Sequence, residues 1–286
     1  MAAADGRIAE RRVGIGAPYN AAMPEGAGRR IRGLLLDLDG TIYQAGSPIP
    51  GVGKTLAALR EAGLSFRFVT NTTRKPRSAV LAALRQMGIE AKEGEVLTAT
   101  VAAAAWLRRQ GAERALLLLP EAAREDFPGL EPTAAEPEYV VVGDLGDAWS
   151  YQLLNRAFRA LKAGASLVAI QRNRFWESDD GLALDAGAFV AALEYAADTE
   201  AELVGKPSPA FFAAAVADLG MPASQVAMVG DDLEADAQGA RGAGLIGVAV
   251  RTGKYRPDDE RRSREVADAV LDSVADLPAW LELGKR

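Results

Sequence analysis

The feature that most constrains the fold is a short apolar run ending in two acids, LLLDLD at residues 34–39, followed by Gly40 and Thr41. Consecutive apolar residues in so short a run are typical of a parallel strand buried on both faces. Ligands bind at the carboxyl ends of such strands, and glycine allows a sharp turn there. We therefore expect Asp37 and Asp39 to face a ligand site; the alternative is a strand that merely ends in an acidic turn.

Three further apolar stretches are followed by polar side chains. Residues 66–69 precede Thr70 and Asn71, a lysine, Lys206, follows residues 203–205, and residues 226–230 precede Asp231. These patterns predict an acid, a hydroxyl, an ammonium group and a second acid at the ends of four strands. Taken singly, Lys206 has a surface charge as its alternative interpretation.

The segments between these stretches alternate between strand and helix patterns. Apolar spacing predicts core helices at residues 52–62, 77–87 and 98–109. Such alternation favours an α/β fold with a Rossmann-like, doubly wound parallel sheet and right-handed crossovers. The 134 residues between Asn71 and Lys206 exceed what one crossover needs. We expect an inserted α/β cap at 111–200, with strands at 115–119, 139–142 and 166–170 and helices at 151–163 and 187–196, in a core of 31–110 and 201–286.

Composition excludes several classes of function. The chain has no cysteine and no histidine, so disulfides, thiolate nucleophiles and Ser-His pairs are excluded. A net charge of -6 with dispersed basic residues argues against nucleic acid as a partner. Without a long apolar run or a secretory signal, we expect no membrane partner and a cytoplasmic location. Residues 1–30 have no periodicity and are expected to be a disordered leader; Asp5, Glu10 and Glu25 count against an organellar presequence.

In order, the polar fragments resemble the four motifs of the haloacid dehalogenase superfamily: D-x-D-G-T from Asp37, a Ser/Thr at Thr70, a lysine at Lys206, and G-D-D-x-x-x-D from Gly230. The resemblance covers about residues 31–257. An insertion between the second and third motifs implies class IIA, with a C2-type α/β cap. Residues 66–73, 204–212 and 250–257 are similar to the subfamily that contains phospholysine phosphohistidine inorganic pyrophosphate phosphatase.

This resemblance implies hydrolysis of small phosphorylated molecules. A carboxylate attacking a phosphate anion needs a cation and hydrogen-bond donors, and Mg²⁺ prefers oxygen ligands. Asp37 is then the expected nucleophile and Asp39 the general acid and base. Lys206 would neutralise charge, and Thr70, with the backbone around Asn71 and Thr72, would bind phosphate.

Other roles follow from the resemblance alone. It implies magnesium ligands from Asp37, the carbonyl of Asp39 and Asp231, with Asp232 and Asp236 orienting water or Lys206. For Asp236, the alternative is an acid in the first turn of a helix, favoured by the helix dipole. Asp39 also favours phosphate hydrolysis over dehalogenation, because the resembled dehalogenases lack an acid at this position. A homodimer through the cap is a further expectation.

The cap segment at residues 171–181 combines arginines, aromatics and acids. In the resembled family the equivalent loop reaches the leaving group, so we expect substrate selectivity to depend on Arg172, Arg174, Phe175 or Trp176. The alternative is an ordinary exposed turn.

Two alternative functions stay open: a catalytically silent binding protein of this fold, and a phosphotransferase. Gly239, Gly242 and Gly244 are expected to serve helix packing and capping, and Trp106 and Trp280 to be packing residues.

Overall fold

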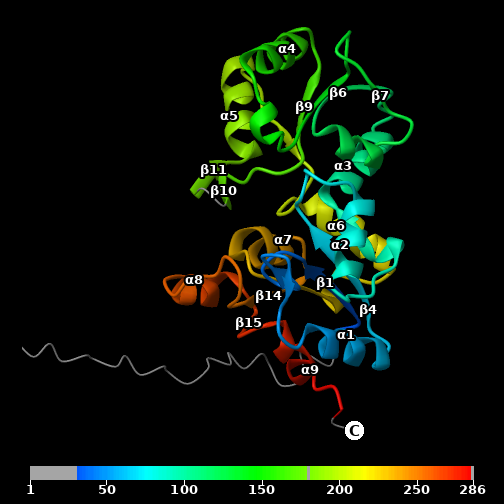
Figure 1. Ribbon diagram of the computed structural model, residues 1–286, viewed down its shortest axis with the longest axis vertical. Coiled ribbons are helices and arrows are strands. Elements are labelled where there is room, and N and C mark those ends of the chain that lie inside the picture. The colour runs from blue at the N-terminus through cyan, green and yellow to red at the C-terminus, as the bar shows by residue number, and fades with distance from the viewer. Residues whose placement is uncertain (1–30, 179–180, 285–286) are drawn as a thin grey trace, which may run out of the picture.

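The computed structural model describes residues 31–178 and 181–284. Its larger sheet has six parallel strands in the order β15-β14-β13-β1-β4-β5 (Figure 1). The strands are β1 Gly33–Asp37, β4 Ser65–Thr70, β5 Val96–Thr98, β13 Val226–Gly230, β14 Ile246–Val250 and β15 Ala269–Leu271. The chain builds outward from β1 in one direction and from β13 in the other, so the strand order reverses between them. This is the point of an open parallel sheet at which ligands bind.

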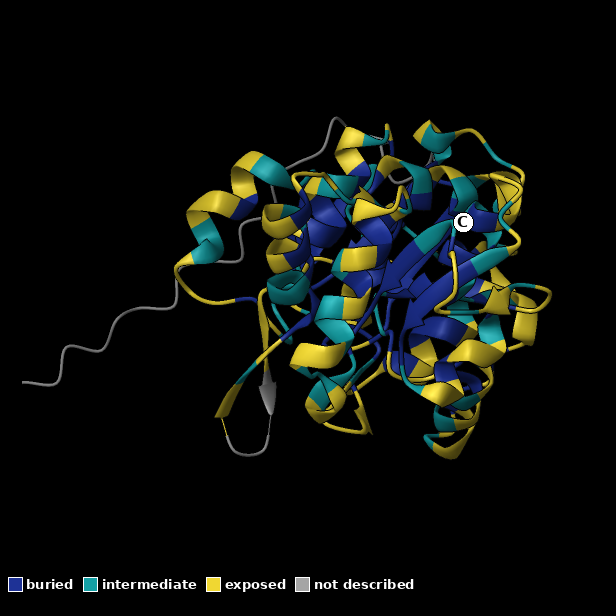
Figure 2. Cartoon of the chain, turned by 90° about the horizontal axis from the view of Figure 1, so that it is seen from above, coloured by how far each residue is buried: buried dark blue, intermediate teal, exposed yellow. Residues whose placement is uncertain are grey.

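Helices cover both faces of this sheet because successive strand residues point to opposite sides. Leu34 and Leu36 pack into one apolar cluster and Leu35 into another. The first cluster lies under α1 Val52–Glu61, α2 Arg77–Gln86 and α9 Leu277–Trp280, and the second under α6 Pro209–Leu219 and α7 Gly239–Gly242. Figure 2 shows the strands as a buried centre inside helices whose outer faces are exposed. This part also contains helix α8 Asp259–Val266 and a π-helical segment, η6 Leu233–Gln238.

A second parallel sheet stands above the first in Figure 1, with the order β12-β9-β8-β6-β7. Its strands are β6 Arg114–Leu118, β7 Glu131–Pro132, β8 Tyr139–Val142, β9 Ser166–Ala169 and β12 Glu202–Leu203. Helices α4 Tyr151–Lys162 and α5 Ala186–Ala197 cover one face, and α3 Ala99–Arg109 covers the other. The expected α/β class, a Rossmann-like sheet with an inserted α/β unit, is confirmed.

The two units meet near the expected boundaries, which remain predictions. Helix α3 and strand β12, assigned from sequence to the core, pack with the second sheet. We call the unit built on this second sheet the cap. The leader expected at residues 1–30 lies outside the described residues. None of the described helices has both the length and the apolar character needed to cross a bilayer.

One expectation about local structure was wrong. The sequence predicts a loop at residues 171–181, but β10 Phe175–Ser178 and β11 Gly181–Leu184 form an antiparallel hairpin. Its apolar residues are exposed on one face, so it lacks the buried alternation by which a strand is recognised. Shorter elements complete the described chain: β2 Tyr43–Gln44, β3 Ser47–Pro48, and the 3-10 segments η2 Glu93–Glu95, η3 Glu121–Asp126, η4 Gly146–Ala148, η5 Ala223–Gln225 and η7 Val274–Asp276.

Candidate active site

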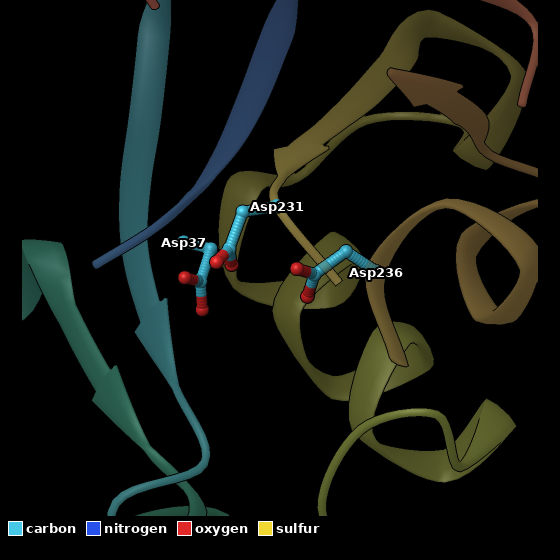
Figure 3. Close-up of side chains that lie close together, drawn as sticks. All are labelled: Asp37, Asp231 and Asp236. Carbon is cyan, nitrogen blue, oxygen red and sulfur yellow. The ribbon is translucent and has the colours of Figure 1, made fainter. Parts of the chain in front are cut away.

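Three carboxylates converge where the strand order reverses (Figure 3). Asp37 ends β1, Asp231 follows β13, and Asp236 comes from η6; each offers an oxygen within 4.8 Å of the others. All three are at most 7% exposed. Burial, followed by repulsion from Asp37 and Asp236, raises the pKa of Asp231 well above its usual value. Such crowding of buried acids is unfavourable unless a cation offsets it.

Lys206 supplies one such cation. Its Nζ donates to Asp37 Oδ1 and, at 2.7 Å, to Asp236 Oδ1, and the lysine is 3% exposed. Burial alone would lower the pKa of Lys206, but attraction by Asp236 and Asp37 outweighs burial and raises that pKa above its usual value. The ammonium group is therefore charged and fixed beside the expected nucleophile.

The position of Lys206 differs from the sequence expectation of a strand end. The lysine lies in a turn after β12, before α6, with a cis peptide bond to Pro207. The side chain of Asn71 holds this turn: Lys206 N donates to Asn71 Oδ1 at 2.9 Å, and Asn71 Nδ2 donates to Lys206 O at 2.8 Å. The amide of Asn71 therefore positions the lysine, which leaves the backbone of Asn71 available for the predicted binding of phosphate.

Asp231 is held in a cradle of two glycines. Gly40 and Gly253 have φ of 84° and 64°, and a Cβ on either would lie 2.1 or 2.0 Å from Asp231 Oδ2. Lys254 N donates to the same oxygen at 2.6 Å. The Lys254 side chain in turn pairs with Asp232 at 3.0 Å. Residues 253 and 254 therefore orient both Asp231 and Asp232. In the sequence, this segment stands out only through the resemblance at residues 250–257.

The donor set fits a hard divalent cation. Within the described residues, Asp37 Oδ2 and Asp231 Oδ1 accept no hydrogen bond, so each acid keeps one oxygen for a metal. Asp236 has no such oxygen, because Oδ1 accepts from Lys206 and Oδ2 from Asp232 N at 3.2 Å. Oxygen-only donors suit Mg²⁺ or Ca²⁺. Asp236 thus contacts Lys206, one of the two groups that it was expected to orient, and its role remains a prediction.

A cleft of about 500 Å³ opens between the acids and the cap. Asp39, exposed at the mouth, and the buried hydroxyl of Thr70 line it, and Thr72 N donates to Thr70 Oγ1 at 3.1 Å. The sequence-predicted residues that line the cleft are Asp37, Asp39, Thr70, Asn71, Thr72, Trp176, Lys206, Asp231, Asp232 and Asp236. The structure therefore brings all of the motif residues together.

The four residues expected to read the substrate are not brought together. Only Trp176 lines the cleft. Arg172 is turned to α5, where its Nη2 lies 2.6 Å from Glu194 Oε2. Phe175 is 58% exposed on the opposite face of the hairpin, because neighbouring strand residues alternate in direction, and Arg174 is exposed outside the cleft lining.

Sequence reasoning missed several residues of the cleft. They come from segments that carry no motif of their own: Tyr43, Arg74, Asp144, Gln171, Asn173, Asp185 and Lys254. The sequence signal for them was their position next to predicted site residues: Arg74 follows the predicted phosphate segment, and Asn173 lies within the predicted cap segment. Of the features set aside, Gly239 packs tightly, because a Cβ there would meet Pro207 Cβ at 2.6 Å. Trp106 packs edge-on against Tyr139.

Comparison with known proteins gives consistent matches. Residues 34–130 match a family described as haloacid dehalogenase-like hydrolase, and residues 203–277 match a second HAD-hydrolase-like family. Haloacid dehalogenase-like hydrolase domain-containing protein 2 of Homo sapiens is 41% identical over 82% of this chain and 89% of its own. Phospholysine phosphohistidine inorganic pyrophosphate phosphatase of Bos taurus is 38% identical over 86% of this chain and 92% of its own. The structure of a Mycobacterium tuberculosis glycerol phosphate phosphatase in complex with magnesium superposes with a TM-score of 0.78 at 31% identity, covering 88% of this chain and 77% of that one.

Proposed function

The chain belongs to the haloacid dehalogenase-like hydrolases, and we propose that it is a magnesium-dependent phosphatase acting through an aspartyl-phosphate. Its substrates in this proposal are small phosphorylated metabolites, pyrophosphate or phosphoamidates. The observation that carries the proposal is the geometry of Lys206, which is bonded to Asp37 and Asp236 next to Asp231. A lysine fixed against one oxygen of a buried acid orients that acid and offsets its charge.

Asp37 and Asp231 each have a carboxylate oxygen that accepts no hydrogen bond from the described part of the chain, and these oxygens would hold the metal together with the backbone carbonyl of Asp39. When bound, Mg²⁺ supplies positive charge that offsets the charge of the phosphate and the aspartates. Asp236 keeps Lys206 directed at Asp37. The relative from Mycobacterium tuberculosis, solved in complex with magnesium and in complex with calcium, supports a divalent cation of this kind.

In the first half-reaction, an oxygen of Asp37 attacks phosphorus while the bond to the leaving oxygen or nitrogen breaks. Asp39 gives its proton to the leaving atom. Thr70 and the backbone of Asn71 would donate hydrogen bonds to the phosphoryl oxygens; the backbone of Thr72, whose N–H donates to Thr70 Oγ1 in the structure, would join them by exchanging that acceptor for a phosphoryl oxygen. The products of this step are the free leaving group and a phosphorylated Asp37.

In the second half-reaction, Asp39 takes a proton from water and the water oxygen attacks phosphorus. The bond between phosphorus and Asp37 breaks, which releases inorganic phosphate and restores both side chains. The exposure of Asp39 at the mouth of the cleft suits exchange of water for leaving group. A phosphotransferase would follow the same path with a second acceptor in place of water.

A substrate screen tests the proposal. Purified protein would be incubated with magnesium and a panel of sugar phosphates, nucleotides, pyrophosphate, phospholysine and nitrophenyl phosphate, and released phosphate would be measured. We expect release from several members, loss of release with a chelator, and recovery when magnesium is restored. The matched control is Asp37→Asn.

Phosphate release that persists in chelator, or no release from any member by folded protein, would contradict the proposal. The second outcome would favour the catalytically silent alternative. Transfer of phosphate to added alcohols faster than to water would favour the phosphotransferase. The homodimer through the cap and the cytoplasmic location remain predictions.

A further inference from the structure

Arg74 joins the core to the cap across the cleft, although no motif assigns it a role. It follows the predicted phosphate segment, in the chain between β4 and α2. Its Nε lies 2.9 Å from Asp144 Oδ2 in the cap, and its Cζ lies 4.9 Å from the ring centre of Trp176. One side chain of the core therefore contacts both the segment after β8 and the hairpin.

The contact with the segment after β8 is a close one. Asp144 N donates to Thr73 Oγ1 at 2.8 Å, next to the ion pair of Arg74. A Cβ at Gly146 would lie 2.1 Å from Arg74 Nη2, and one at Gly143 would lie 2.9 Å from Thr73 Cβ. Two glycines thus let the cap rest directly on residues 73–74.

Asp144 is fixed on its own side as well. Its Oδ1 accepts from Gly146 N at 2.8 Å, and its side chain is 7% exposed. A buried carboxylate with both oxygens engaged is a rigid anchor for the guanidinium. The orientation of Arg74 is therefore determined before Trp176 is considered.

The hairpin is attached to the rest of the cap mainly at its base. Asp185 N donates to Arg174 O at 3.1 Å, and Gly187 N donates to Asn173 O at 3.0 Å. On the outer face of the hairpin, Phe175 near the base and Leu182 toward the tip are 58% and 74% exposed. Figure 1 shows the hairpin projecting from the cap on the side of the core. The contact with Arg74 links Trp176 to the core across the cleft.

We propose that Arg74 is a positioning residue for leaving-group selectivity. It holds Trp176 as a wall of the cleft, against which a planar ring of the leaving group stacks. The inference rests on the proposed phosphatase function and identifies the substrate class as phosphate esters or amidates whose leaving group carries a planar ring. Because Thr73 and Arg74 directly follow Thr72, the same segment places the phosphate and the wall relative to each other.

A competing explanation is that Arg74 only stabilises the contact between core and cap. Its side chain is 43% exposed, and exposed ion pairs contribute little to stability. A purely structural arginine would change activity toward all substrates alike. A positioning arginine would change the ratio between substrates and would act through Trp176.

The test compares phenyl phosphate with ethyl phosphate, which differ in the ring. Arg74→Ala and Trp176→Ala should each lower the ratio of kcat/KM for phenyl over ethyl phosphate by about 3–10-fold, mainly through KM. The double variant should lower it no further than Trp176→Ala does, because the two side chains act as one unit. The control Arg114→Ala removes ion pairs to Glu136 and Glu138 from the cap away from the cleft and should leave the ratio unchanged.

Hydrogen exchange gives a second measurement that does not depend on activity. Backbone amides of 175–178 and 181–184 should exchange faster in Arg74→Ala than in the wild type and in Arg114→Ala. An unchanged ratio in Arg74→Ala with a changed ratio in Trp176→Ala, additive effects in the double variant, or unchanged exchange in the hairpin would each overturn the inference. If the wild type hydrolyses neither ester but releases phosphate from other members of the panel, the proposed function stands and the selectivity for a planar ring is overturned. If it releases phosphate from no member, the proposed function fails, and the exchange experiment still decides whether Arg74 holds the hairpin.

Discussion

The two walls of the cleft are built in opposite ways. On the core wall, Asp37, Asp231, Asp236 and Lys206 are nearly inaccessible and bond to one another or to the backbone. On the cap wall, Trp176 is 37% exposed and belongs to a hairpin whose outer face is open to solvent. Fixed, buried charge suits a step common to every substrate, whereas a wall with few attachments can change without disturbing that step.

The largest expected effect is on the core wall. Asp37→Asn keeps the shape of the side chain but removes the nucleophile and a negative charge from the proposed metal site. Turnover should fall by about 10⁴-fold or more, while the fold is kept. Phosphate release under single-turnover conditions measures this, with circular dichroism as the check on folding. Near-normal release by the folded variant would contradict the claim that the core wall carries out the chemical step through Asp37.

Asp39→Ala should have the next largest effect on turnover, because the same carboxylate serves both half-reactions. General acid-base groups contribute about 10²–10⁴-fold, so the loss should be of that size for alkyl phosphates. With nitrophenyl phosphate, whose leaving group needs little protonation, the first step should lose less. Burst and steady-state rates on both substrate types separate the two steps, and equal losses in all four would refute a dual role.

Lys206→Met should affect stability as well as activity. It leaves Asp37 and Asp236 buried without their cation, and loss of one partner of a buried ion pair costs about 3–5 kcal/mol. Urea denaturation without added metal measures the free energy of unfolding. Lys54→Met, on the exposed side of α1, is the control and should change little. Equal stability of the two variants would mean that the buried charges are not coupled as described.

The smallest effect is expected on the cap wall. Trp176→Ala should change the ranking of natural substrates by roughly 10-fold or less, since aromatic contacts are worth about 0.5–1.5 kcal/mol. Phe175→Ala, on the other face of the hairpin, should leave the ranking intact. Measured kcat/KM values across the substrate panel test this. A larger change from Phe175→Ala than from Trp176→Ala would mean that the substrate contacts the face of the hairpin that carries Phe175, which contradicts this assignment.

The same difference explains what the sequence could predict. Asp37 and Asp231 come at the ends of strongly apolar strands, so a parallel sheet alone brings them together. The resemblance to the haloacid dehalogenase superfamily added the order of the four motifs along the chain. The position of Lys206 was partly wrong, because a turn held by Asn71 depends on contacts between residues 135 apart in the chain. Arg74 and Asp144 could not be paired from sequence, since their contact depends on how the cap rests on the core. The hairpin was missed because its exposed apolar face looks like neither a buried strand nor a polar loop.

The central claim is that Asp37 becomes phosphorylated during turnover. Rapid acid quenching of enzyme mixed with substrate and magnesium, followed by mass spectrometry of its peptides, tests this directly. The account predicts a phosphoryl group on Asp37 within the burst, reduced without magnesium and absent in Asp37→Asn. Full turnover with no phosphorylated peptide, or with the phosphoryl group on another residue, would contradict it.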